Sequence, residues 1–117
     1  MSANQLLIWN RGSRLLTWNG EEIATPGALL WAEELPQKNG IAAVTLFDES
    51  TPDEVPNAFI FEKSGKFQPL IIKEDGRLVR FLGCYSEGDQ IVFNAANETE
   101  YLVNPESNEV ISTRYYR

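Results

Sequence analysis

Short apolar runs separated by turn residues dominate the second half of the chain, from Phe67 to Tyr116. The runs begin about every ten residues, a spacing typical of an antiparallel sheet or barrel. Asp75-Gly76 is the strongest turn signal, because both residues tolerate the positive φ of a tight hairpin. The runs cover residues 70–72, 78–82, 91–93, 101–103 and 110–116.

Apolar and polar residues alternate in the last three runs, which predicts a sheet with one dry face and one wet face. The dry face would hold Ile91, Phe93, Tyr101, Val103, Ile111, Thr113 and Tyr115. The wet face would hold Gln90, Asn94, Glu98, Glu100, Ser112 and Arg114. Residues 78–82 are apolar on both faces except for Arg80, which predicts a more central strand. Pro69 cannot donate to a ladder, so residues 67–73 read as an edge or bulged strand.

A near repeat, Leu-Leu-x-Trp-Asn, occupies residues 6–10 and 15–19, with Arg-Gly-Ser-Arg between the copies. It predicts two antiparallel strands joined by a loop. Trp9 and Trp18 then either fill the core or form an exposed platform for a partner or a sugar. The two interpretations differ in the exposure of the Trp rings.

The segment 26–35 predicts one short helix, because Thr25 can cap it, Pro26 suits its first position, and Leu35-Pro36 ends it. The competing interpretation is a strand that pairs with residues 41–47 through the turn 36–40. Residues 41–47 and 58–61 read as buried strands.

These patterns predict a mainly β fold, with α+β as the variant. We expect an antiparallel meander sheet or a partly open barrel or sandwich, with about eight or nine short strands and one short helix near residues 26–35. At 117 residues, the chain is expected to form a single domain over 1–117.

The formal net charge is −7, and the acids are clustered. Residues 21–62 carry nine acids against Lys38, and residues 81–113 carry six acids and no base. Phosphate backbones and anionic membranes repel such a chain, so neither nucleic acid nor a membrane is an expected partner. A basic protein is the expected partner, unless the acidity serves only solubility.

Candidate chemistry is sparse. The chain has no histidine and one cysteine, which excludes Ser-His and Cys-His catalysis and a structural zinc site. We therefore expect no cofactor, no metal and no enzyme activity, and we expect Cys84 to be a core side chain. No apolar run approaches the ~18 residues of a membrane span, and the start of the chain does not resemble a signal peptide. These features predict a cytoplasmic protein.

The segment 48–57 is acidic and contains two prolines, so it predicts a surface loop. Its carboxylates, Asp48, Glu49, Asp53 and Glu54, lack the spacing of a calcium loop. We interpret them as a solvated loop or, with Trp9 and Trp18, as a protein-docking surface.

The leading functional hypothesis is an acidic protein-binding module, such as an intracellular inhibitor or immunity-type protein. The first alternative is a structural or assembly subunit, either a phage or secretion component or a homo-oligomer. The second is a β-domain that binds a small molecule or a carbohydrate.

Overall fold

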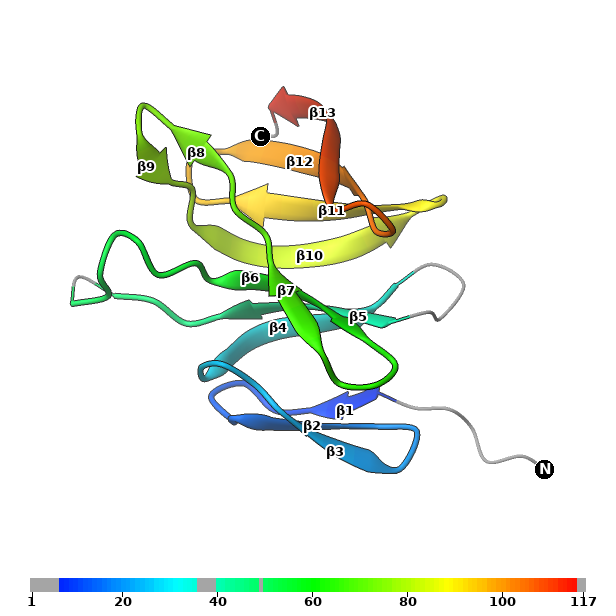
Figure 1. Ribbon diagram of the computed structural model, residues 1–117. Helices are drawn as coiled ribbons and strands as arrows, with labels where there is room; N and C mark the ends of the chain where they lie inside the picture. The colour runs from blue at the N-terminus through cyan, green and yellow to red at the C-terminus, as the bar shows by residue number, and fades with distance from the viewer. Residues whose placement is uncertain (1–6, 36–39, 49, 116–117) are drawn as a thin grey trace.

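The computed structural model describes residues 7–35, 40–48 and 50–115, and within these ranges the protein is all β (Figure 1). Thirteen strands form four antiparallel sheets that do not close into a barrel. The mainly β prediction is therefore confirmed. The expected eight or nine strands were too few, because several strands are only two to four residues long.

Three of the sheets are stacked in layers, and a small hairpin lies beside the uppermost layer (Figure 1). The N-terminal sheet contains β1 (Leu7–Trp9), β2 (Leu15–Trp18) and β3 (Glu21–Ala24). The middle sheet contains β4 (Leu29–Glu34), β5 (Gly40–Thr45), β6 (Ala58–Glu62) and β7 (Phe67–Pro69). The hairpin contains β8 (Lys73–Glu74) and β9 (Arg77–Leu78), and the C-terminal sheet contains β10 (Phe81–Glu87), β11 (Gln90–Ala95), β12 (Thr99–Asn104) and β13 (Glu109–Tyr115).

The N-terminal sheet confirms the predicted hairpin of the Leu-Leu-x-Trp-Asn repeat. Leu7 pairs with Trp18 and Trp9 pairs with Leu16, so these four side chains share one face. The third strand, β3, was not predicted. It follows a tight turn in which Asn19 and Gly20 both have positive φ, 55° and 83°, as a two-residue hairpin requires.

The centre of the middle sheet is buried on both faces, and all six residues of β5 are buried. Ile41 and Ala43 belong to the core cluster shared with the N-terminal sheet. Ala42 and Val44 belong to the cluster shared with the C-terminal sheet. Because successive side chains in a strand point to opposite faces, β5 contributes to both cores.

The helix predicted near residues 26–35 is wrong, and the competing strand interpretation is confirmed. β4 pairs with β5 from Leu29–Thr45 to Glu34–Ile41, with an irregularity between Leu29 and Trp31. The helix propensity of Ala, Leu and Glu is a weak preference. It is outweighed because buried β5 requires hydrogen-bond partners on both of its edges. Residues 36–39 of the predicted turn lie outside the described ranges.

The C-terminal sheet is a four-stranded meander whose inner face packs on the middle sheet. The predicted dry face is confirmed in β11 and β12, where Ile91, Phe93 and Val103 are fully buried. It is wrong for β13, which is exposed along its whole length.

Two predictions about individual strands have opposite outcomes. The central strand predicted at residues 78–82 is wrong, because β9 ends at Leu78 and β10 begins at Phe81 on the edge of its sheet. β7, which contains Pro69, is the edge strand of the middle sheet as predicted.

Candidate functional site

The acidic loop, residues 46–57, connects β5 to β6 and contains Asp48, Asp53 and Glu54. The fourth predicted acid, Glu49, lies outside the described residues. The loop is irregular as predicted, and two turns shape it. In these turns the Thr51 N–H donates to the Asp48 carbonyl at 3.0 Å, and the Val55 N–H donates to the Pro52 carbonyl at 3.1 Å.

The carboxylate of Asp48 stabilises the first of these turns. Its Oδ1 accepts hydrogen bonds from the hydroxyl of Ser50 at 2.6 Å and from the Ser50 N–H at 2.8 Å. The hydroxyl bond first, and then the N–H bond, lower the pKa of Asp48 below its ordinary value. Asp48 is therefore ionised at neutral pH.

Arg80 holds the second half of the loop. Its guanidinium donates to the Pro52 carbonyl at 2.7 Å and also to the Val55 carbonyl. The same group lies 5.7 Å from the centre of the Phe47 ring. Because Arg80 binds backbone oxygens and an aromatic ring, it orders the loop without neutralising the loop's carboxylates.

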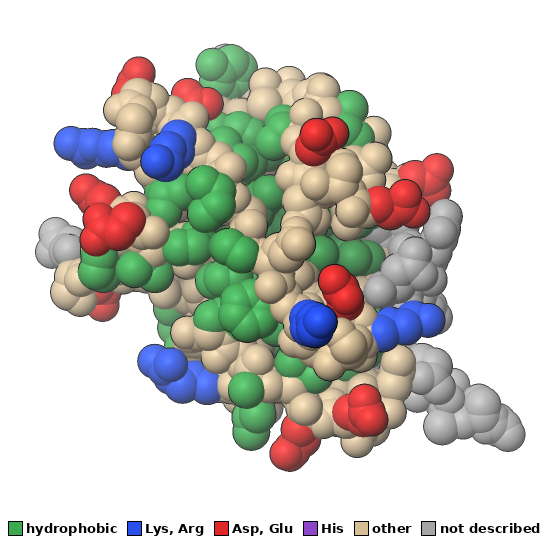
Figure 2. All heavy atoms as spheres, viewed as in Figure 1, with side chains coloured by type: hydrophobic (Ala, Val, Ile, Leu, Met, Phe, Trp, Pro, Cys, Tyr) green, Lys and Arg blue, Asp and Glu red, His purple; other side chains and the backbone are tan. Residues whose placement is uncertain are grey.

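Asp53 and Glu54 line a depression of about 400 Å³ together with Lys73 and Arg77 of the β8–β9 hairpin. Both ion pairs found within the described ranges belong to Arg114, so neither Asp53 nor Glu54 is in one. Figure 2 shows acidic side chains over the loop at the left of the molecule, next to basic side chains over the hairpin. The two carboxylates are thus free to contact a partner, beside two bases that offset part of their charge.

The two predicted Trp residues lie in a different part of the fold, on the N-terminal sheet. Trp18 is 3% exposed, and its indole N–H donates to Glu34 Oε2 at 2.8 Å. The core interpretation is confirmed for Trp18, whose ring is not available as a surface platform. Trp9 is half-buried, with its ring centre 5.4 Å from that of Trp31 in an edge-to-face arrangement. The exposed ring of the three is Trp31, which the sequence interpretation had placed on a helix.

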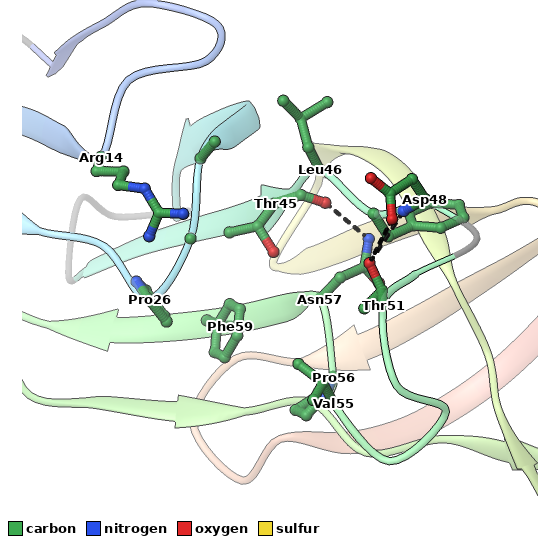
Figure 3. A pocket seen from close by; sticks show the side chains of 13 residues that line it. Arg14, Pro26, Thr45, Leu46, Asp48, Thr51, Val55, Pro56, Asn57 and Phe59 are labelled. Carbon is green, nitrogen blue, oxygen red and sulfur yellow. Dashed lines mark hydrogen bonds between the residues drawn. The ribbon is translucent and has the colours of Figure 1, made fainter.

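A second pocket, of about 520 Å³, is lined by other residues of the acidic loop (Figure 3). Three backbone segments form it: the end of the β1–β2 loop, the β3–β4 connection, and the acidic loop with the adjoining ends of β5 and β6. Arg14 reaches in from one side and Asp48 lies on the other, with Thr45 between them in this view. The apolar part of its lining consists of Pro26, Ala28, Leu46, Phe47, Val55, Pro56 and Phe59.

Asn57 fixes the base of this pocket. It is 2% exposed, and its amide donates to the carbonyls of Thr45 and Phe81, both at 2.9 Å. Its Oδ1 accepts from the Phe81 N–H at 3.0 Å. Asn57 therefore ties both ends of the acidic loop to the start of the C-terminal sheet.

A polar network crosses the outer face of the C-terminal sheet around Glu100. The carboxylate accepts from Arg114 Nε at 2.7 Å, and from the Tyr85 hydroxyl and the Asn94 amide at 2.9 Å each. Arg114 also pairs with Glu87 at 2.7 Å. The alternation placed Glu100 and Arg114 on the wet face, but only the cross-strand register shows that they face each other.

Burial and hydrogen bonding act in opposite directions on Glu100. Burial acts to raise the pKa of its carboxyl, but the hydrogen bonds from Arg114, Tyr85 and Asn94 together hold that pKa below its ordinary value. Burial, followed by the hydrogen bond to Glu100, raises the pKa of Tyr85. The network is a charged, fully bonded structural element, and neither group is poised for proton transfer at neutral pH.

The remaining candidate chemistry is limited. Cys84 is buried, and its pKa is raised first by burial and then by the charge of Glu33. No group of three or more acidic, Cys or His side chains gathers as a metal site in the described ranges. Those ranges also contain no helix with the length and hydrophobicity that a membrane crossing requires.

Comparison with known proteins does not assign the chain to a family. No protein-family model matches the sequence, and no curated protein matches it either.

Proposed function

We propose that the protein is a non-enzymatic, acidic protein-binding module of the cytoplasm, and that its acidic loop docks on a basic partner. An inhibitor or immunity-type protein is the functional class that this proposal favours. The main support for this proposal is how the acidic loop is ordered. Arg80 binds the backbone of the loop, and the carboxylates of Asp53 and Glu54 are left without an ion pair in the described structure.

A loop that is already ordered loses less conformational entropy on binding, so more of the contact energy contributes to affinity. The net charge of −7 would attract a basic protein over distances of about a Debye length, which raises the association rate. Leu46 and Val55, which are 42% and 43% exposed, flank the acids and offer apolar contacts to the same partner.

A second candidate, self-assembly as a structural subunit, is supported by β13. This strand is at the edge of its sheet, and all seven of its residues are exposed, including Val110, Ile111 and Tyr115. Unprotected edges are surfaces on which strands of other chains can pair. Sedimentation of the purified protein over a range of concentrations distinguishes the candidates, because a strict monomer contradicts homo-oligomerisation.

The docking proposal is tested by capturing basic proteins from the native cell at low and at raised salt. The test variant is the double substitution Asp53→Asn, Glu54→Gln. The matched control is Glu21→Gln, Glu22→Gln, an adjacent exposed pair on β3 that changes the net charge equally. We expect the first variant to weaken capture on the order of tenfold, and the control to weaken it much less.

Two results would contradict docking through this loop. One is that no basic protein is captured at either salt concentration. The other is that both double variants lose binding equally, because that would indicate a diffuse charge effect.

A further inference from the structure

The pocket between Arg14 and Asp48 has the size and lining of a small-molecule site. Its volume of about 520 Å³ lies within the range of about 300–1,000 Å³ that such sites occupy. Its lining is mostly aromatic, aliphatic and proline side chains, with a few polar groups placed among them. These polar groups determine which ligand the pocket fits.

The cationic side of the pocket is Arg14. Its side chain makes no hydrogen bond or ion pair with the described part of the chain, and Figure 3 shows its guanidinium directed toward the pocket. A guanidinium presents several donors in a planar fork and binds carboxylates well. Arg14 therefore supplies a site for a carboxylate.

The anionic side is Asp48. Its carboxylate is held in place through Oδ1, which accepts two hydrogen bonds from Ser50 and a longer one, at 3.4 Å, from the Thr51 hydroxyl. An anchored carboxylate at the rim is suited to accept a hydrogen bond from an ammonium group. Thr45 lies between the two charged groups, only 5% exposed, and its hydroxyl forms no hydrogen bond to the residues that the structure describes.

We propose that this pocket binds a small zwitterion with an apolar body, such as an ω-amino acid or a short peptide, with its carboxylate at Arg14 and its ammonium at Asp48. This inference goes beyond partner docking, whose charged contacts we assign to Asp53 and Glu54. Neither of those residues lines the pocket, although Leu46 and Val55 border both surfaces.

The overall charge of the protein favours a zwitterion over simpler ions. A lone anion would be repelled by the field of a chain with a net charge of −7. A lone cation would meet the unpaired charge of Arg14 inside the pocket. A net-neutral ligand avoids both penalties when its dipole is aligned with the two charged side chains.

The probes are 6-aminohexanoic acid and 8-aminooctanoic acid, with hexanoic acid and hexylamine as singly charged analogues. Binding is followed by two-dimensional NMR of the full chain, through the backbone amide signals of Thr45, Leu46 and Asp48. We expect at least one of the zwitterions to bind on the order of tenfold more tightly than either analogue. Equal binding of hexanoic acid, or no shift of these signals with any probe, overturns the proposal.

A matched pair of variants tests the role of Arg14. Arg14→Gln removes the proposed carboxylate contact, whereas Arg11→Gln removes an exposed arginine of the same β1–β2 loop that does not line the pocket. We expect Arg14→Gln to weaken binding of the zwitterion on the order of tenfold and not to weaken binding of hexylamine, and Arg11→Gln to leave both unchanged. Equal effects of the two variants overturn the proposal.

Asp48→Asn provides a second test that does not depend on Arg14. It should weaken binding of the zwitterion while binding of hexanoic acid does not fall. Unchanged affinity for the zwitterion would contradict the ammonium contact. Failure of these binding tests would leave the docking proposal unaffected, because the docking test changes different residues.

Discussion

The side chain of Asn57 forms hydrogen bonds with both backbone groups of Phe81: it donates to the carbonyl at 2.9 Å and accepts from the N–H at 3.0 Å. The side-chain amide thus makes the two hydrogen bonds to Phe81 that the backbone of a neighbouring strand would otherwise make, at the start of edge strand β10. A third bond, to the Thr45 carbonyl at 2.9 Å, joins β5 to the same point. One buried side chain therefore connects the middle and C-terminal sheets beside the acidic loop.

Replacing this amide should destabilise the whole protein. We expect Asn57→Ala to lower the free energy of unfolding by about 2–4 kcal/mol, because it leaves buried backbone groups without partners. Asn10→Ala, at an exposed asparagine in the β1–β2 loop, should change it by less than about 0.5 kcal/mol. Urea unfolding of the two variants gives the comparison. Equal stability of both would contradict the structural role of Asn57.

Gly40 should not tolerate a side chain. A Cβ at this position would lie 2.2 Å from the carbonyl oxygen of Phe61 and 3.1 Å from Cδ1 of Leu35. We expect Gly40→Ala to cost about 2–4 kcal/mol in the free energy of unfolding, because the paired backbone of β5 and β6 would have to move at a buried position. Gly83→Ala is the matched control, since the nearest atom to its Cβ would be Asn94 Oδ1 at 3.8 Å. Similar unfolding midpoints for the two variants would contradict this packing.

Turns and the alternation of strand residues could be predicted from the sequence, because both are determined by residues that are adjacent in the chain. The Asp75-Gly76 turn has both residues at positive φ, 55° and 79°, as the sequence indicated. The alternation in β11 and β12 correctly gave their inner face, but the opposite face is not simply exposed, because Val92, Leu102 and Glu100 on it are also buried. The short β3 was missed, because Glu21 and Glu22 are consecutive acids that do not resemble a strand.

Features that depend on the third dimension were not predictable in the same way. The segment now in β4 has good helix formers, and only its position beside the doubly buried β5 makes it a strand. The sequence singled out the acidic loop, but it gave no sign that Arg80 would hold it from 25 residues away. Arg14 and Asp48 line the same pocket although they belong to loops of different sheets. The way the sheets stack cannot be read from local sequence patterns.

The thiol of Cys84 should be unreactive in the native protein. It is buried, and burial first, with the charge of Glu33 second, raises its pKa well above the ordinary value. Since the thiolate is the nucleophile, we expect iodoacetamide at pH ~8 to modify the native protein on the order of 100-fold more slowly than the urea-unfolded protein. Mass spectrometry follows the reaction, and Cys84→Ala provides the background. Rapid modification under native conditions would show that the layers open at this point.

Acid should weaken the protein partly through Glu100. The pKa of the Glu100 carboxyl is lower in the folded protein than in the unfolded chain. The ionised carboxylate therefore stabilises the fold at pH values above the ordinary carboxyl pKa of about 4.3. This stabilisation is lost as the pH falls through the pKa that Glu100 has in the folded protein. We therefore expect the urea midpoint of the wild type to fall more between pH ~6 and ~3 than that of Glu100→Gln, which has no carboxyl to protonate at this position. Glu106→Gln, at an exposed turn residue, should keep the wild-type slope. If Glu100→Gln and Glu106→Gln have the same pH dependence, the hydrogen bonds from Arg114, Tyr85 and Asn94 do not stabilise the ionised carboxylate in solution.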